Sequence, residues 1–292
     1  SGQDLRYSSS YDDSYDVKLG DLDGDGDLDA FEVIYNQGNR VWLNDGDGNY
    51  TDSGQDLRYS TSFDNSWDVD LADIDGDGDL DAFVANYSQG NRVWRNDGTG
   101  SFTDSGQSLD SGPDNSYGVD LADLDGDGDL DAYVANQNQG NKVWLNDGSG
   151  SFTDSGLSLS NQSSYGADLG DIDGDGTIDA IVASESYYNY NKVWLNDSSG
   201  VFTDSGQALG TEDSYGVALG DVDGDGDLDA FLTKYLRPNE VWFNDGTGNF
   251  PLVLTLDGDL DGDEVTGNSE FDYSYKSLGV ALGDLNNDGY PD

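Results

Sequence analysis

The feature that most constrains this chain is a nine-residue acidic motif that returns at a regular spacing. Its first copy, Asp21–Asp29, holds aspartates at alternate positions, with Gly24 and Gly26 between them. Further copies, which we call loops two to six, begin at Asp73, Asp123, Asp171, Asp221 and, in altered form, Asp284. Such a segment does not fold by itself, because its carboxylates repel one another and its glycines lose backbone entropy on ordering. We therefore expect a repeat protein whose acidic loops are neutralised by a bound group.

The spacing of the oxygen atoms in each loop favours a hard cation. Carboxylates at positions 1, 3, 5 and 9, with a backbone carbonyl at position 7, can surround one ion, and glycine at position 6 permits a sharp turn. Calcium accepts about 6–8 oxygen ligands in a flexible shell, whereas magnesium needs a tight octahedron. Position 7 is Thr177 in loop four and Tyr290 in loop six, as expected of a residue that contributes its backbone oxygen. The sequence therefore predicts about six Ca²⁺ ions, one per loop.

The predicted metal-binding residues are the oxygen-bearing odd positions of each loop. They are Asp21, Asp23, Asp25, Asp27 and Asp29; Asp73, Asp75, Asp77, Asp79 and Asp81; Asp123, Asp125, Asp127, Asp129 and Asp131; Asp171, Asp173, Asp175, Thr177 and Asp179; Asp221, Asp223, Asp225, Asp227 and Asp229; and Asp284, Asn286, Asp288, Tyr290 and Asp292.

The composition excludes several classes of function. A formal net charge of −50 leaves no basic surface for nucleic acid or anionic membranes. The chain has no Cys, His or Met, which removes histidine acid–base catalysis, cysteine nucleophiles and the usual zinc, copper and haem ligands. No run approaches the roughly 20 apolar residues of a membrane span. We expect no catalytic residues and no cofactor other than calcium.

Between the acidic loops, the pattern of apolar and polar residues predicts short β-strands. In the first repeat, Tyr15, Val17 and Leu19 alternate with polar residues, and the apolar runs 30–35 and 40–44 and a short segment from Asn49 follow the loop. The same frame gives repeat units at about 14–52, 66–104, 116–154, 164–204 and 214–250, a partial unit at 277–292, and an irregular insertion at 251–276. All lie in one array over residues 1–292.

Four antiparallel strands per repeat cannot bury both faces of a sheet alone. Stacking such sheets around an axis closes the core, so the predicted fold is all-β: a β-propeller of about six four-stranded blades, the last incomplete, with one calcium loop per blade. The tryptophans that recur in the third strands are expected to pack between adjacent sheets. They are Trp42, Trp94, Trp144, Trp194 and Trp242.

Two motifs together resemble a known family. Asp-h-Asp-Gly-Asp-Gly-x-h-Asp (h apolar), followed by Val-Trp-x-Asn-Asp-Gly-x-Gly-x-Phe, is similar to the FG-GAP/VCBS repeat. The resemblance implies the calcium-binding β-propeller of integrin α subunits and of secreted microbial and fungal proteins, some of them lectins. It also implies that each loop joins the first two strands of a blade and binds one Ca²⁺. The chain lacks Gly-Ala-Pro and Arg-Gly-Asp, so integrin-type partner recognition is not implied.

These features predict an extracellular, calcium-stabilised adhesion or recognition module that binds protein or carbohydrate and is not an enzyme. Tyr187 and Tyr188 are candidate sugar-stacking residues, and sequons at Asn49, Asn86, Asn161 and Asn196 permit N-glycans. The alternative is a structural subunit of an extracellular fibre, sheath or surface layer, assembled head-to-tail from copies of itself. A secreted lyase or hydrolase is the least favoured interpretation.

Overall fold

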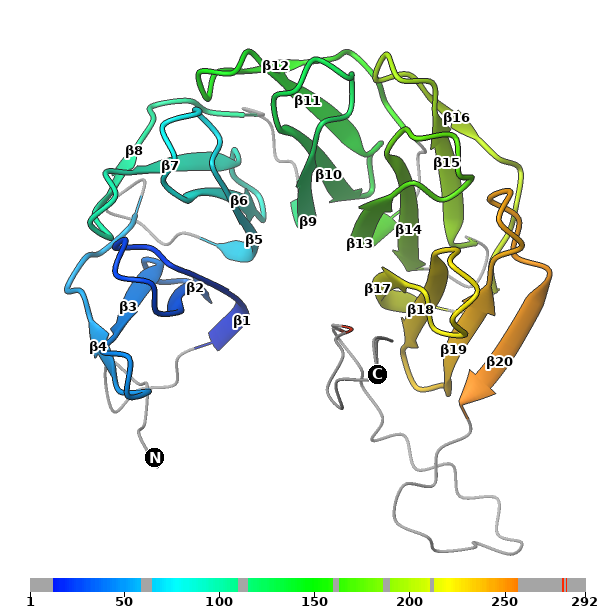
Figure 1. Ribbon diagram of the computed structural model, residues 1–292, viewed down its shortest axis with the longest axis horizontal. Coiled ribbons are helices and arrows are strands. Elements are labelled where there is room, and N and C mark those ends of the chain that lie inside the picture. The colour runs from blue at the N-terminus through cyan, green and yellow to red at the C-terminus, as the bar shows by residue number, and fades with distance from the viewer. Residues whose placement is uncertain are drawn as a thin grey trace, which may run out of the picture. The chain divides into compact units, whose positions relative to one another are not determined.

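The computed structural model describes residues 13–58, 65–109, 115–159, 163–185, 190–210, 213–256, 280 and 282. The chain divides into two compact units, Ser1–Asn161 and Gln162–Asp292. The described residues of both units form β-strands and turns, without a helix (Figure 1). Accordingly, the described part contains no helix long and apolar enough to span a membrane.

The first unit contains three sheets of four strands. The first sheet is formed by β1 (Asp13–Gly20), β2 (Asp29–Tyr35), β3 (Arg40–Asn44) and β4 (Tyr50–Asp52). The second is formed by β5 (Ser66–Ala72), β6 (Asp81–Asn86), β7 (Arg92–Asn96) and β8 (Phe102–Asp104). The third is formed by β9 (Asn115–Ala122), β10 (Asp131–Gln137), β11 (Lys142–Asn146) and β12 (Phe152–Asp154).

The second unit contains two sheets of the same kind. The fourth sheet is formed by β13 (Ser163–Gly170), β14 (Asp179–Glu185), β15 (Lys192–Asn196) and β16 (Phe202–Asp204). The fifth is formed by β17 (Ser214–Gly220), β18 (Asp229–Lys234), β19 (Asn239–Phe243) and β20 (Leu252–Leu256). The predicted all-β class and the four-stranded antiparallel repeat are thus confirmed in five sheets.

The strand register places every acidic loop at the same point of its sheet. Gly20 pairs with Asp29 at the end of the β1–β2 ladder, so the residues between them form the connection of a hairpin. The corresponding pairs are Ala72 with Asp81, Ala122 with Asp131, Gly170 with Asp179 and Gly220 with Asp229. The first two strands of each sheet therefore present its loop, as predicted.

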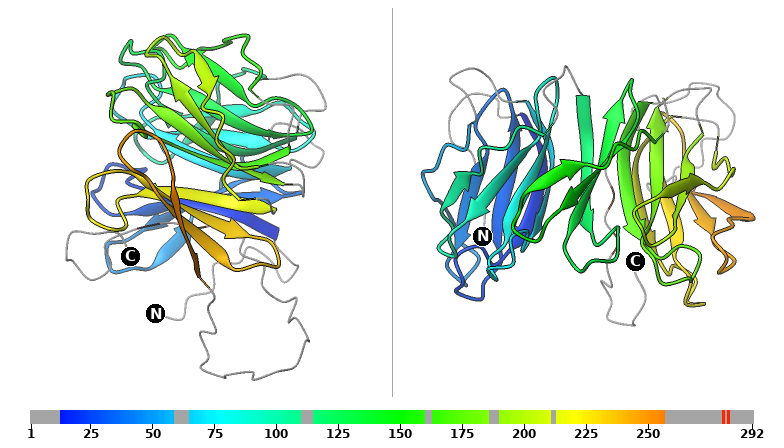
Figure 2. Two further views of the ribbon diagram at one scale, coloured as in Figure 1. Left: turned by 90° about the vertical axis from the view of Figure 1, so that its right-hand side faces the viewer. Right: turned by 90° about the horizontal axis from the view of Figure 1, so that it is seen from above.

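The cores lie between adjacent sheets of a unit, which stack face to face (Figure 2). Phe31, Val33 and Val41 of the first sheet meet Val69, Val84 and other apolar residues of the second. Equivalent clusters join the second sheet to the third and the fourth to the fifth. Because both faces of β6 are covered, its six residues are all buried, and the alternation seen in exposed strands is lost. Trp94 and Trp144 lie in these clusters, which confirms their predicted packing role.

The fifth sheet ends differently from the other four. Its last strand, β20, pairs with β19 along five residues, whereas the other fourth strands have three. This strand lies within the segment 251–276, where the repeat pattern breaks but the run 251–256 is strand-like in sequence. Phe250, just before it, packs in the core as Phe102 and Phe152 do. Every residue of β20 is exposed.

Candidate metal centres

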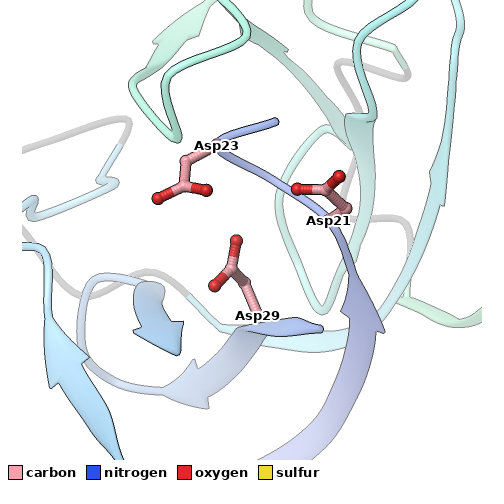
Figure 3. Close-up of side chains that lie close together, drawn as sticks. All are labelled: Asp21, Asp23 and Asp29. Atoms are coloured by element: carbon pink, nitrogen blue, oxygen red, sulfur yellow. The ribbon is translucent and has the colours of Figure 1, made fainter. Parts of the chain in front are cut away.

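Each acidic loop gathers carboxylates at one point beside the first two strands. In loop one, the side chains of Asp21, Asp23 and Asp29 point toward one another, with Asp21 just after β1 and Asp29 at the start of β2 (Figure 3). One oxygen atom from each lies within 4.8 Å of the others. Two oxygens that share a calcium ion at about 2.3–2.6 Å are at most roughly 5 Å apart, so the separation fits a common ion.

A triad of neighbouring aspartates occurs in all five loops that the structure describes. The triads are Asp21, Asp23 and Asp29; Asp73, Asp75 and Asp77; Asp123, Asp125 and Asp127; Asp171, Asp173 and Asp179; and Asp221, Asp223 and Asp225. Positions 1 and 3 are present in each triad, and the third member is position 5 or position 9. Loop six, with Asp284, Asn286, Asp288, Tyr290 and Asp292, lies outside the described residues, as do Tyr187, Tyr188 and Asn161.

Backbone hydrogen bonds fix the aspartate at position 1. Gly24 N donates to Asp21 Oδ1 at 2.9 Å and Gly26 N donates to Asp21 Oδ2 at 3.1 Å. Both glycines have positive φ, 76° and 92°, which brings their N–H groups round toward the carboxylate. The pattern recurs at Asp73, Asp123 and Asp221. The loop is therefore shaped around position 1 by its own backbone.

Two oxygens of the triad aspartates lack a hydrogen-bond donor among the described residues, and a cation fits beside them. Asp75 Oδ1 and Asp171 Oδ1 are buried, and neither accepts a hydrogen bond from the described residues. Both aspartates belong to triads. A buried carboxylate oxygen without a partner is costly, and a hard cation satisfies it. The donor set therefore suits a divalent ion that prefers oxygen.

The aspartate at position 9 has a second role that the sequence did not reveal. Asp29 is 0% exposed; its Oδ2 accepts from Leu22 N at 2.9 Å and its Oδ1 accepts from Asn44 N at 2.7 Å. It thus joins the loop to the end of β3. Asp81, Asp131, Asp179 and Asp229 are also fully buried, and each accepts a hydrogen bond from a backbone N–H at the end of the third strand of its sheet or, for Asp229, from Asn244 just after it.

Burial and crowding disfavour the ionised form of several loop carboxyls. Burial raises the pKa of Asp81, Asp131 and Asp179 to about 6. The pKa of Asp23 is raised by burial and then by the neighbouring carboxylates Asp29 and Asp25. A cation among these groups opposes both effects, because it stabilises the charged carboxylates. Proton and metal ion therefore compete for the same sites.

The side chain at position 7 faces a turn. A β-carbon placed on Gly46, in the turn between β3 and β4, would lie 2.5 Å from Asp27 Oδ2. The same close approach joins Gly98 with Asp79, Gly148 with Asp129 and Gly246 with Asp227. In loop four, where position 7 is Thr177, the turn residue is Ser198. This relation is visible in the sequence, because serine replaces the turn glycine only in the repeat where threonine replaces the aspartate at position 7.

Asparagine side chains connect loops one, two and four to the next sheet of the same unit. Asn96 Nδ2 of the second sheet donates to Leu22 O in loop one at 2.8 Å. Asn146 Nδ2 donates likewise to Ile74 O, and Asn244 Nδ2 to Ile172 O. Order in one loop is thus coupled to the sheet that packs against it.

Comparison with solved structures supports the fold. A chain in the crystal structure of BBS1N in complex with ARL6DN aligns with a TM-score of 0.56 at 11% identity, covering 85% of this chain and 70% of that one. The V. cholerae biofilm matrix protein Bap1 aligns with a TM-score of 0.52 at 18% identity, covering 86% of this chain and 41% of that one. No curated protein matches the chain.

A family model matches the repeats themselves. The FG-GAP-like repeat matches four times, at residues 21–84, 73–134, 123–182 and 171–232. Each match begins at the first aspartate of one loop and ends in the second strand of the next repeat. Together the matches cover residues 21–232 of 292. The chain therefore belongs to the FG-GAP-like repeat family.

Proposed function

We propose that this protein is an extracellular, calcium-stabilised β-propeller module that recognises a protein or carbohydrate partner and has no catalytic activity. The observation that carries the proposal is the aspartate triad that recurs at one point of each described repeat. Loops of extracellular modules bind calcium at about 10⁻⁴–10⁻³ M, which suits the calcium outside cells. Membership of the FG-GAP-like family and the fold similarity to a biofilm matrix protein agree with that location.

Calcium acts here as a structural staple. Bound by the triad of a loop, it removes carboxylate repulsion and draws together the end of the first strand and the start of the second. An asparagine of the following sheet donates a hydrogen bond to a backbone carbonyl of the loop, so ordering of the loop also stabilises that sheet. An ion that binds only the folded state adds about 2.7 kcal/mol per site at a hundredfold excess over Kd.

An aromatic row in the first unit supports a recognition role. The ring centroids of Tyr15 and Trp67 lie 4.0 Å apart, and those of Trp67 and Tyr117 lie 4.4 Å apart. All three lie near the start of the first strand of their sheet, at the end opposite the acidic loops. Tyr15 is 43% exposed. Aromatic rings with polar tips suit contact with sugars, so this row is the proposed contact surface.

Glycan binding tests this proposal. We expect the protein to bind members of a glycan array in millimolar calcium, and Tyr15→Ala to weaken that binding while leaving the melting temperature nearly unchanged. Val201→Ala, at an exposed residue in the second unit, is the matched control. A screen without any binder, or Tyr15→Ala binding as wild type, would contradict recognition through this row.

Among the sequons, Asn49 is the proposed glycosylation site. Its side chain is exposed, whereas Asn86 and Asn196 are buried. Asn86 also accepts a hydrogen bond from Ser66 and donates one to Gly90 O. A glycan at either buried asparagine would displace core contacts.

A head-to-tail structural subunit is the second candidate, and one observation favours it. Val17 and Leu19 of β1 are 52% and 57% exposed, and Leu28 of the adjoining loop one is 55% exposed. Their counterparts Val69, Leu71 and Leu80 pack against the first sheet. An apolar sheet face of this kind favours association with another sheet. Sedimentation velocity decides: calcium-dependent polymers support this role, and a monomer at all concentrations contradicts it.

A further inference from the structure

Loop two differs from the other described loops by an arginine at its side. Arg95 Nη1 lies 3.2 Å from Oδ2 of Asp75, the position-3 aspartate of that loop. Arg95 Nη2 also donates a hydrogen bond to Ser149 O, in the turn between β11 and β12 of the third sheet. The guanidinium thus links the loop to the sheet that follows it.

Uncharged residues occupy the same place in the other repeats. The equivalents of Arg95 are Leu43, Leu145, Leu195 and Phe243. A β-carbon on Gly150 would meet Arg95 and Asp75, one on Gly100 would meet Leu43 and Asp23, and one on Gly248 would meet Leu195 and Asp173. These three glycines face equivalent positions, so the chain itself provides comparisons in which an uncharged, non-donating side chain stands in the place of Arg95.

The arginine engages one oxygen of a triad member and leaves the other. Asp75 Oδ2 pairs with Arg95, while Asp75 Oδ1 is buried and accepts no hydrogen bond from the described residues. A divalent ion at loop two would share Asp75 with a fixed positive charge. The two positive charges repel each other, and this repulsion is only partly screened because Asp75 is 15% exposed and Arg95 38% exposed.

We propose that Arg95 is a built-in counter-ion of loop two, which makes this loop the weakest calcium site of the described repeats and holds it in place without the ion. The inference rests on the proposed calcium function. It gives the five loops unequal roles: when calcium falls, loop two empties first, yet its contact with the third sheet is retained through Arg95.

Calcium titration calorimetry of Arg95→Leu tests the affinity. Without the guanidinium, the weakest site should bind about tenfold more tightly. The change should vanish in an Asp73→Asn background, which disables loop two. Leu195→Arg, the reciprocal change beside Asp173, should weaken one site about tenfold. Unchanged or weaker binding by Arg95→Leu would overturn the proposal.

Melting in EDTA tests the ion-free role separately. Arg95→Leu should lower Tm by about 2 °C, because Asp75 loses its counter-ion and Ser149 O its donor. If neither wild type nor Leu195→Arg binds calcium, the proposed function fails. The melting temperature in EDTA then shows by itself whether Arg95 stabilises loop two as a counter-ion. If Arg95→Leu leaves Tm in EDTA unchanged or raises it, the proposal that Arg95 is a counter-ion of Asp75 is wrong.

Discussion

Loops two and four differ in how they fill the space between the side chain at position 7 and the turn that joins the third and fourth strands. In loop two, Asp79 lies so close to the turn that a β-carbon on Gly98 would be 2.5 Å from its Oδ2. In loop four, Thr177 Oγ1 lies within hydrogen-bonding distance of Asn196 O, at 3.1 Å, and the turn residue is Ser198 with a φ of 64°. A side chain in the turn is accommodated beside threonine but not beside aspartate. Position 7 and the turn residue therefore fit each other sterically and change together within this chain.

The two loops also differ in how position 9 is held, and this difference gives the largest expected effect. Asp179 accepts from Ile172 N and Asn196 N, whereas the donor to Asp81 is Asn96 N. Removing a buried acceptor leaves its donors without a partner, which lowers the free energy of unfolding by about 1–3 kcal/mol for each donor. We therefore expect Asp179→Ala to cost about 3 kcal/mol and Asp81→Ala about 2 kcal/mol. Urea unfolding in EDTA, which excludes any ion, measures both; equal costs would contradict the assignment.

The turn pair gives the next largest effect. Gly98 has a φ of 73°, so Gly98→Ser combines left-handed strain with a clash against Asp79 and should cost about 2 kcal/mol. Asp79→Thr with Gly98→Ser recreates the pair of loop four and should recover more than half of that cost. A double-mutant cycle checks this coupling. Additive effects of the two substitutions would show that the residues are independent.

A smaller effect per group concerns pH, and here the two loops should behave alike. Burial raises the pKa of Asp81 and Asp179 to about 6, above the usual value near 3.9 of an unfolded aspartate. The folded state therefore binds more protons, so in EDTA stability should be lost as pH rises through 6 and regained below it. We expect about 1 kcal/mol per group between pH 7 and pH 5.

Calcium should reverse the sign of this pH dependence, because protons compete with the ion for the triads. Unfolding free energies at pH 5 and pH 7, with calcium and with EDTA, provide the comparison. Asp81→Asn should remove one group's share of the slope in EDTA. An EDTA-treated protein that is more stable at pH 7 than at pH 5 would contradict the prediction.

Much of the repeat could be predicted from the sequence because local periods determine it. The strand alternation around Tyr15 and Val17, the turn residues and the odd-numbered aspartates repeat within each unit, and the structure confirms five such units. The hairpin position of the loops followed from the same pattern.

Features that depend on distant neighbours could not be predicted in this way. The anchoring role of Asp29 arises because Asn44 reaches it from another strand. The contact between Arg95 and Ser149 joins two repeats. In the fifth sheet an apolar run stands where other repeats have Thr-Asp-Ser-Gly, and β20 pairs with β19 along five residues, whereas the other fourth strands pair along three.

Thermal melting of the whole chain in millimolar calcium and in EDTA at neutral pH tests most directly whether calcium bound in the loops stabilises the fold. With five described loops binding only the folded state, we expect calcium to raise Tm by at least about 10 °C at a hundredfold excess over Kd. Magnesium at the same concentration should raise it less, because the loops suit a larger and more flexible oxygen shell. Superimposable melting curves in calcium and in EDTA would contradict the account.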